Sequence, residues 1–359
     1  MSGAGPDAWG QPDRWRALGT YVDLRVAHPA AAGHAGALAR SVLDEVDRTC
    51  SRFRSDSDLS RANRLTGQWV GVSTVLVGAV RVALEAAEET AGLVDPCLGE
   101  LIVAAGYDRT FAQLRTSATP VALPAAAATD RWRDVEVRDD ALRIPPGVAV
   151  DLGATGKAYA ADLVAHTLAQ ALDVSIVVSV GGDLRALAPT GEPVGWPVRI
   201  AHRPPDTEPT PHGQPPHGQP PHGQPLHEQT PDEQSSHEQA SHEQASHEQT
   251  PQGQAVDVVL AEGGLATSSV TARRWVRGGQ DWHHVLDPRT ARPAAGPWVT
   301  ASAFGATAVA ANTASLGALV LGHGATEWLE ERGVAARLVD HAERVHCTRA
   351  WSTVERTAA

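Results

Sequence analysis

The segment Asp151-Leu-Gly-Ala-Thr-Gly-Lys-Ala-Tyr-Ala-Ala-Asp162 follows an apolar run at 148–150 and leads through two glycines into a helical residue pattern. We therefore expect a strand, a tight turn and a helix in succession. The segment also holds Lys157, the only lysine among the 30 basic residues of the chain. A chain that otherwise uses arginine and keeps one lysine in such a turn needs a compact ammonium group there. The turn is therefore the first candidate site for chemistry.

The glycines of this turn suit it to binding an anion. They let the backbone approach a ligand closely, and the amides at the start of the following helix favour a phosphate. Lys157 would then neutralise the second charge of a diphosphate. The glycine spacing matches neither a Walker A loop nor a Rossmann turn, which disfavours those nucleotide folds. A glycine turn with a solvated lysine remains the alternative.

Composition narrows the class of protein. The formal charge of −12 includes eight acidic residues between 204 and 254, where no Lys or Arg occurs, so the remainder carries −4. There is no basic stripe for a nucleic acid, no apolar run of about 18 residues for a membrane span, and no signal-peptide pattern at the N-terminus. Three cysteines without metal-type spacing suit reduced thiols. We expect a cytoplasmic protein without nucleic-acid or membrane partners.

A low-complexity segment covers 204–254. It repeats five-residue units, first Pro-His-Gly-Gln-Pro and then variants of Ser-His-Glu-Gln-Ala. With so few apolar residues it cannot offset the entropy lost on ordering, so we predict a disordered insertion. Eight of the sixteen histidines lie between His202 and His247, which leaves weak binding of divalent metal open beside the reading as a linker.

The flanking sequence predicts a mixture of helices and strands. Short runs rich in β-formers at 196–202 and 256–260 are consistent with one hairpin that carries the insertion. Helices are expected at 37–50, at 74–90 behind a Ser73 N-cap, and at 306–321, and strands at 174–180 and 282–286 with a turn at 262–264. Because strict βαβ alternation is missing, the pattern favours an α+β fold.

The predicted organisation is one compact catalytic unit interrupted by the insertion. Its first part is 17–203 and its second part is 255–352. The insertion occupies 204–254, and the ends at 1–16 and 353–359 are expected to be flexible.

Two further segments hold candidate polar residues. Gly181-Gly-Asp183 follows the predicted strand at 174–180 and places a carboxylate at a strand end beside flexible backbone. In the second segment His284 is a candidate general base, and Asp287 would orient it or hold a metal, with Pro288 fixing the following turn. A histidine with a purely structural role is the alternative for His284.

Taken together and in this order, six segments resemble motifs of the ApbE-type FAD:protein FMN transferase family. The match extends over nearly the whole chain outside the insertion, and Leu18 stands where the family has a methionine. The segments are Ala17-Leu-Gly-Thr-Tyr21, Ser51 to Asn63, Val94-Asp-Pro-Cys-Leu-Gly99, Asp151 to Asp162, Leu265-Ala-Thr-Ser268, and His284-Val-Leu-Asp-Pro-Arg-Thr290. The resemblance implies an ApbE-like (T-fold-like) fold of mixed sheets and packed helices.

The resemblance also implies a reaction and a site. Family members bind FAD and Mg²⁺, cleave the diphosphate and attach FMN to a Thr or Ser of a protein acceptor, releasing AMP. Lys157 would supply charge at the diphosphate and His284 would be the base, with Asp287 beside it. The carbonyl of Ala154 would face the metal. The implied FAD-binding residues are Leu18, Phe53, Leu93, Val94, Asp95, Asp151 and Lys157, and we add Gly181, Gly182 and Asp183.

One departure from the family concerns the metal. The family's metal helix reads Ala-Asp-Ala-Leu-Ala-Thr-Ala, whereas the matching segment here has Asn312 in place of the carboxylate and Leu316 in place of the hydroxyl. An amide oxygen ligates without charge and leucine cannot ligate, although Ser315, three residues after Asn312, would partly substitute. We expect a weaker or differently arranged Mg²⁺ site. A small-residue packing helix is the alternative reading of 306–321.

Three functions remain open at this point. The first is FMN transfer to a protein, the second is hydrolysis of FAD to FMN and AMP, and the third is flavin binding without chemistry. Asn312 and Leu316 are the residues that favour the third.

Overall fold

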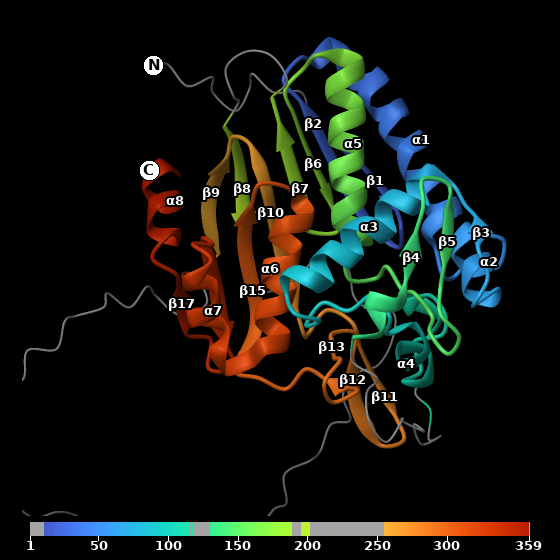
Figure 1. Cartoon of the computed structure of the whole chain (residues 1–359). Helices are drawn as coiled ribbons and strands as arrows, with labels where there is room; N and C mark the ends of the chain where they lie inside the picture. The colour runs from blue at the N-terminus through green and yellow to red at the C-terminus, as the bar shows by residue number, and fades with distance from the viewer. Residues whose placement is uncertain (1–10, 115–116, 118–129, 189–194, 202–254, 359) are drawn as a thin grey trace, which may run out of the picture. The chain divides into compact units, whose positions relative to one another are not determined.

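The computed structural model describes residues 11–114, 117, 130–188, 195–201 and 255–358, without the side chains of 355–358, and its largest element is an antiparallel sheet of eight strands in this part of the chain (Figure 1). In spatial order the strands are β1 (Asp13–Ala17), β2 (Thr20–Val26), β6 (Ile176–Val180), β7 (Asp183–Leu187), β10 (Gly263–Ser269), β15 (Trp298–Gly305), β16 (Ala336–Asp340) and β17 (Val345–Cys347).

Strand β6 explains why the sheet is covered on both faces. Its sequence, Ile-Val-Val-Ser-Val, is almost continuously apolar. Because side chains alternate between faces, Ile176, Val178 and Val180 enter one core cluster and Val177 enters another. A strand with one solvated face would instead alternate apolar and polar residues.

Helices cover the first face of the sheet. Figure 1 shows α1, α5 and α6 lying across it, with α3 packed over them. Helices α1 and α5 bury alanine, leucine and valine side chains against β2 and β6 in the main core, whereas α6 packs on β10 and β15. The helices are α1 (Ala32–Cys50), α2 (Asp58–Arg64), α3 (Thr74–Glu89), α4 (Gly99–Ala104), α5 (Gly156–Leu172), α6 (Ala308–Leu321), α7 (Ala325–Glu331) and α8 (Trp351–Ala358).

A hairpin and the last helix cover the second face. Strands β8 (Trp196–Ile200) and β9 (Val256–Leu260) pair in register, so that Ile200 lies opposite Val256. Their apolar side chains pack with Val177 and with Trp351 at the start of α8. This confirms the predicted hairpin, and the described residues on both sides of 202–254 belong to one compact unit. The predicted disorder of 204–254 lies outside the described residues.

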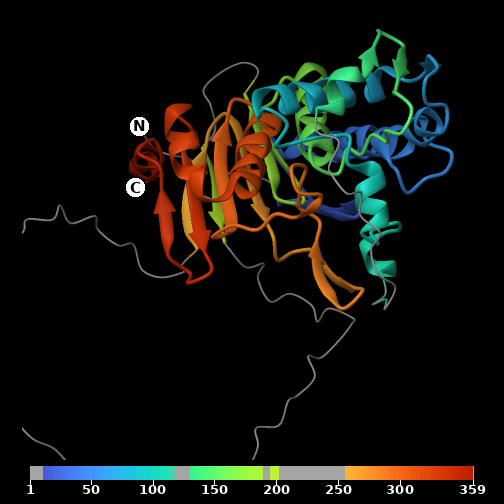
Figure 2. The ribbon, with the colours of Figure 1, turned by 60° about the horizontal axis from the view of Figure 1, so that its bottom comes forward.

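The remaining strands form small sheets beside the main one. The β11 (Arg274–Arg277) and β12 (Gln280–His283) hairpin projects next to α4, as Figure 2 shows. The indole N–H of Trp275 donates to the carbonyl of Ala105 at 2.8 Å and joins the two elements. The other small sheets contain β3 (Val70–Gly71), β5 (Ala141–Arg143) and β4 (Glu136–Val137), and β13 (Leu286–Asp287) with β14 (Arg292–Pro293).

Several sequence predictions are confirmed and several need correction. The α+β fold is correct, and α3 begins behind the Ser73 N-cap, whose hydroxyl accepts from the amide of Leu76. The strand expected at 282–286 is divided between β12 and β13. The flexible end at 1–16 is wrong from Asp13 onward, because β1 pairs with β2 and Arg40 binds the Asp13 carboxylate. The flexible end at 353–359 is wrong because α8 continues to Ala358.

The strand expected at 148–150 does not form, because its backbone groups bond elsewhere. The side chain of Asn63 accepts from the amide of Val150 at 2.8 Å and donates to its carbonyl at 2.9 Å. The amide of Asp151 donates to Pro96, and the carbonyl of Ala149 accepts from Gly99. An extended segment whose polar groups are satisfied in this way needs no neighbouring strand. It anchors the start of the 151–157 turn.

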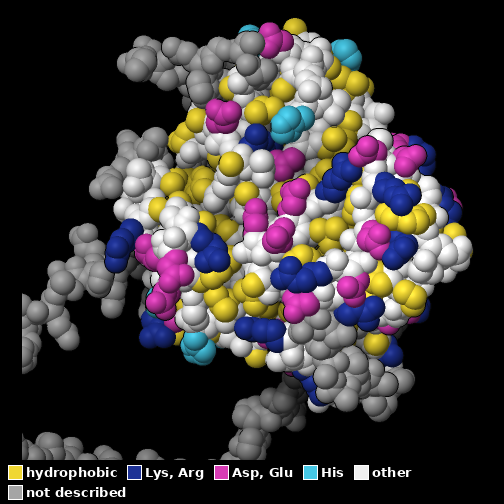
Figure 3. Space-filling model, in the orientation of Figure 1, with side chains coloured by type: hydrophobic (Ala, Val, Ile, Leu, Met, Phe, Trp, Pro, Cys, Tyr) yellow, Lys and Arg dark blue, Asp and Glu magenta, His cyan; other side chains and the backbone are white. Residues whose placement is uncertain are grey.

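Charged side chains of both signs lie close together on the face seen in Figure 3. Ion pairs such as Arg81 with Asp139 and Arg143 with Glu136 join them across the surface. Each exposed pair contributes little stability. Among the helices of the described residues, none combines the length and apolar character required to span a membrane.

Asn63→Ala should destabilise the protein by about 2–3 kcal/mol, because it removes two hydrogen bonds and leaves both backbone groups of Val150 unpaired. Urea unfolding measures the change. Asn63→Asp is the matched control, since it keeps an acceptor for the amide of Val150 and should lose about half as much stability. Equal stability of wild type and Asn63→Ala would contradict the anchoring role.

Deletion of 204–254 should leave the unfolding free energy within about 1 kcal/mol of the wild-type value, because loop-closure entropy depends weakly on loop length. The deletion leaves residues 201–203 and 255 to close the hairpin between the paired Ile200 and Val256. Loops of about this length are common in hairpins. Chemical denaturation of the two proteins compares them, and a loss of several kcal/mol would show that the insertion belongs to the folded unit.

Candidate functional site

A cavity of about 300 Å³ brings the separate motif segments together. Most of the site residues predicted from the sequence line it, although they lie far apart in the chain. These are Phe53, Leu93, Val94, Asp95, Asp151, Ala154, Lys157, Gly181, Asp183, His284, Asn312 and Leu316.

The 151–157 turn forms one wall of the cavity. The Asp151 carboxylate accepts a hydrogen bond from the amide of Gly153 at 2.6 Å, and a Cβ at Gly153 would lie only 2.7 Å from that carboxylate. Helix α5 then begins at Gly156, and its N-cap residue Thr155 makes no side-chain hydrogen bond to the first turn. Lys157 therefore sits in the first turn of a helix whose N-terminus has no side-chain cap.

Lys157, Asp183 and Asn312 form a polar cluster at one end of the cavity. The Lys157 ammonium lies 2.9 Å from one carboxylate oxygen of Asp183, and the Asn312 amide donates to the other at 3.4 Å. Asp183 is only 1% exposed, so the ammonium compensates a carboxylate that has lost its water. The Asn312 side-chain oxygen is buried without a hydrogen-bond partner.

The Gly181-Gly182 turn sets the position of Asp183. Both glycines have positive φ, 64° and 95°, as a two-residue type I′ hairpin turn requires. A Cβ at Gly181 would also lie 2.6 Å from the Thr20 hydroxyl. The turn therefore brings the start of β7, which is Asp183, to the end of β6.

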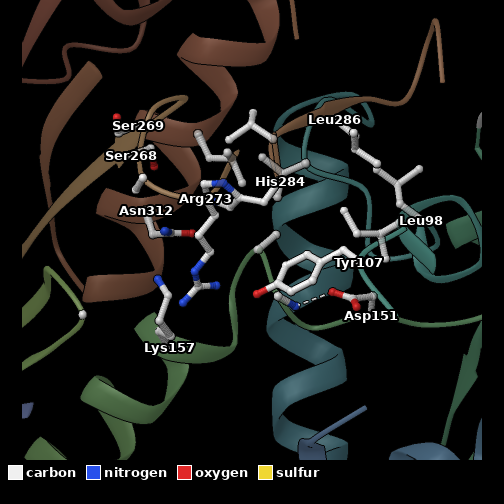
Figure 4. A pocket seen from close by; sticks show the side chains of 18 of the residues that line it. Leu98, Tyr107, Asp151, Lys157, Ser268, Ser269, Arg273, His284, Leu286 and Asn312 are labelled. Atoms are coloured by element: carbon white, nitrogen blue, oxygen red, sulfur yellow. Dashed lines mark hydrogen bonds between the residues drawn. The ribbon is translucent and has the colours of Figure 1, made fainter. Parts of the chain in front are cut away.

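Apolar and aromatic side chains line the other end of the cavity. In Figure 4 Leu98, Tyr107 and Leu286 lie on one side, while Lys157, Asn312 and Arg273 lie on the opposite side. The Tyr107 ring is 5.8 Å from that of Phe53 and 5.5 Å from that of Trp275, measured between centroids. The cavity is thus cationic at one end and aromatic at the other.

Arg52 lines the cavity and contacts both the 151–157 turn and the aromatic side chains. Its guanidinium is 2.5 Å from the Asp151 carboxylate and lies 4.1 Å and 4.8 Å from the ring centroids of Phe53 and Tyr107. Cation–π contacts of this kind hold an arginine side chain in one orientation. Arg52 therefore joins the turn to the aromatic wall.

His284 lies at the end of the β11–β12 hairpin, opposite Arg273. Its amide donates to the carbonyl of Arg273 at 3.2 Å. The next residues of the two strands, Arg274 and His283, lie opposite each other in the antiparallel register. The pKa of His284 is lowered to about 3, mainly because the imidazole is buried and in smaller part because Arg273 and Lys157 place positive charge nearby. The imidazole is therefore neutral at physiological pH, but with so low a pKa it is a weak base while the cavity holds no ligand.

Asp95 is a carboxylate of the cavity whose pKa is raised. It is buried among apolar residues, and desolvation is the main cause, opposed by the hydrogen bond that it accepts from the amide of Cys97 at 2.7 Å. Cys97 is half-buried, and desolvation raises the pKa of its thiol, which lowers its reactivity.

Four predicted site residues lie outside the cavity lining. Asp287 does not orient His284 through a hydrogen bond, because its carboxylate accepts from the backbone and guanidinium of Arg289, all at 2.9 Å. Leu18 packs against the main core and Gly182 lies at the tip of its turn. The Ser315 hydroxyl is fully buried and bonds to the Ser268 hydroxyl and to the carbonyl of Asn312.

The residues present do not fit the Mg²⁺ that the resemblance implies. The metal takes near-octahedral oxygen ligands, usually with one or two carboxylates. Here Asn312 offers one neutral oxygen, Leu316 offers none, and Ser315 is engaged elsewhere. Asp183 is already paired with Lys157. The described residues contain no group of three or more His, Cys, Asp or Glu placed to hold a metal.

Sequence reasoning missed several residues that line the cavity. Arg52, Leu98, Tyr107 and Arg273 belong to this group. The chain has only three Phe and three Tyr, and the contacts of Phe53 and Tyr107 concentrate two of them here. Their scarcity was a usable signal, whereas the position of Arg273 depends on the register of a hairpin.

The fold is that of the solved ApbE flavin transferases. The ApbE protein of Thermotoga maritima superposes with a TM-score of 0.70 at 20% identity, covering 96% of this chain and 99% of the other. The apo flavinyl transferase ApbE of Pseudomonas stutzeri gives 0.69 at 20% identity, covering 96% and 97%.

Sequence comparison places the chain in a family. The ApbE family model matches residues 18–217 and 240–338, and this chain belongs to the ApbE family. The FAD:protein FMN transferase of Klebsiella pneumoniae is 26% identical over 336 residues, covering 90% of this chain and 82% of the relative. That of Treponema pallidum is 27% identical over 330 residues, covering 85% and 77%. The curated relatives are thus transferase enzymes.

Lowering the pH from 7 to 5 should destabilise the protein by about 2 kcal/mol through His284. The unfolded histidine takes up a proton below its ordinary pKa of about 6.5, whereas the folded one resists until about 3, so stability is lost as the pH falls through this window. Thermal unfolding across pH 5–7 measures the slope. His284→Gln should flatten it, and an unchanged slope in that variant would contradict the burial of a neutral imidazole.

Proposed function

We propose that the protein is an FAD:protein FMN transferase, which moves FMN from FAD to a Thr or Ser hydroxyl of a protein acceptor and releases AMP. The observation that carries the proposal is the two-ended cavity, with Lys157 and Asp183 at one end and Tyr107 at the other. FAD has the same two characters, because a charged diphosphate joins two planar ring systems. The names of the curated relatives support the same activity.

The diphosphate would lie at the cationic end. The uncapped first turn of α5 provides amides with partial positive charge, and Lys157 adds a full charge beside them. The flavin or adenine ring would lie against Tyr107 and Phe53, which favour stacked or tilted contacts. Of the residues proposed for FAD binding, Leu18 and Gly182 are the two without a place in the cavity lining.

The proposed step is an in-line displacement at phosphorus. The acceptor hydroxyl oxygen bonds to the phosphorus on the FMN side, and the bridging oxygen leaves with AMP. Neutral His284 takes the hydroxyl proton, and binding of the diphosphate anion raises its basicity by offsetting the nearby positive charges. Lys157 stabilises the negative charge that develops on the phosphoryl oxygens and on the departing AMP.

Magnesium is the part of the family's chemistry that this chain accommodates least well. We infer a weaker dependence on Mg²⁺ than the resemblance implies, since Asn312 and Leu316 replace its expected ligands. The step above assigns no role to a metal. The cytoplasmic location stays a prediction from the sequence.

Flavin binding without chemistry is the second candidate function. Asn312 favours this function, because its buried, unpartnered side-chain oxygen carries no charge. A carboxylate at this position would complete a metal site more readily. Hydrolysis of FAD to FMN and AMP, with water as acceptor, differs from the first proposal only in the nucleophile.

Incubation with FAD and an acceptor domain that carries Ser or Thr, with Mg²⁺ present, should yield AMP and covalently flavinylated acceptor in equal amounts. Chromatography measures AMP, and in-gel flavin fluorescence measures the acceptor. Lys157→Met should lower the rate at least about 100-fold, because charge is lost at the diphosphate. AMP without labelled acceptor would indicate hydrolysis, and tight FAD binding without AMP would indicate the binding function.

Loss of Lys157 also leaves the Asp183 carboxylate buried without its partner, which destabilises the fold. The double variant Lys157→Met with Asp183→Asn removes both charges and serves as the control. It should regain the unfolding temperature while remaining inactive. Recovered activity in this variant would contradict the role of Lys157.

A further inference from the structure

We propose that Arg273 is a diphosphate-binding residue of this chain, whose guanidinium supplies positive charge at the place where Asn312 and Leu316 stand instead of metal ligands. The inference rests on the proposed function, because it assigns the ligand to the same cavity. Neither the motif segments nor the predicted site residues include Arg273.

The hairpin register directs Arg273 into the cavity. Arg274 lies opposite His283, so Arg273 and His284 form the next cross-strand pair, and the His284 amide donates to the Arg273 carbonyl at 3.2 Å. Side chains of directly opposed residues lie on the same face of an antiparallel pair. Figure 4 shows the Arg273 side chain extending toward Lys157 and Asn312, on the side of the cavity opposite Tyr107.

Within the described part of the chain, Arg273 differs from Lys157 and Arg52 in having no acidic partner. Lys157 is paired with Asp183, and Arg52 with Asp151. No carboxylate of the described residues forms an ion pair with Arg273, although the side chain lines the cavity. A diphosphate brings two negative charges, and an uncompensated guanidinium is the cation best placed to receive one of them.

The residues at 312 and 316 are consistent with binding of the diphosphate by Arg273. An aspartate at 312 would be free to pair with Arg273 or with a divalent cation, whereas the neutral amide of Asn312 competes for neither. Leu316 adds apolar surface beside it. Guanidinium groups bind phosphate oxygens in a bidentate manner and keep their charge at any physiological pH. The charge that a metal brings in the family would then belong to the protein itself.

The test compares FAD with riboflavin, which has the same flavin ring and no phosphate. Quenching of flavin fluorescence measures the affinity of both ligands, with Mg²⁺ and with EDTA. Wild type should bind FAD more tightly than riboflavin in both conditions. Arg273→Gln should weaken FAD binding by about 10- to 100-fold and change riboflavin binding by less than about twofold.

The neighbouring arginine provides a matched control. Arg274 lies on the same strand, pairs with Asp281 and is absent from the cavity lining, so Arg274→Gln should leave both affinities unchanged. If Arg273→Gln unfolds at a lower temperature than Arg274→Gln, Arg273→Lys replaces it. That variant keeps the charge without the planar fork and should lose an intermediate part of the FAD affinity.

A rescue variant tests whether the charge of Arg273 takes the place of a bound Mg²⁺. Arg273→Gln combined with Asn312→Asp and Leu316→Thr should recover FAD affinity with Mg²⁺ and lose it with EDTA. The role of Arg273 would be overturned if Arg273→Gln still bound FAD more tightly than riboflavin, or if wild type lost this preference in EDTA. Either result would leave the proposed function intact. A wild type that binds neither FAD nor riboflavin would overturn the proposed function, and the inference with it.

Discussion

The ion pair between Lys157 and Asp183 is the constraint on which the site depends. A carboxylate that is 1% exposed requires a partner, and the ammonium 2.9 Å away is that partner. The pair fixes the first turn of α5 against the start of β7. Helix α5 also fixes the start of α6, because the Asp162 carboxylate accepts hydrogen bonds from the amides of Ala308 and Val309. Asn312 is thereby held next to Asp183.

The main sheet restricts where a ligand site can lie, because both of its faces are covered. Helices cover one face, and the β8–β9 hairpin with α8 covers the other. Among the described residues, the cavity lies where loops and short elements leave the sheet. The projecting β11–β12 hairpin and α4 provide that place, joined by the hydrogen bond from Trp275 to Ala105. The aromatic end of the cavity is therefore built from elements outside the sheet, and the cationic end from elements attached to it.

Sequence reasoning succeeded where the determining interactions are local or where the ordered motifs could be compared as a set. The Ser73 cap, the Gly181-Gly182 turn and the β8–β9 hairpin belong to the first kind, and the cavity segments to the second. It failed where the structure of a segment or the role of a side chain depends on a partner that the local sequence pattern does not reveal. The strand expected at 148–150 is replaced by bonds to Asn63, 87 residues away, and Asp287 bonds to Arg289 rather than to His284. Periodicity carries no information about such partners.

Arg273 and Asn312 are best understood together. With the amide at 312, no carboxylate of the described residues pairs with the guanidinium and its charge is available to a ligand, whereas an aspartate there would compete for it. Burial is the main cause of the low pKa of His284 and the same charge adds to it, so a bound diphosphate would offset part of the effect. The base would therefore strengthen when its substrate is present. The arginine that we propose binds the diphosphate, placed by the register of a short hairpin, would then also affect the basicity of the residue opposite it.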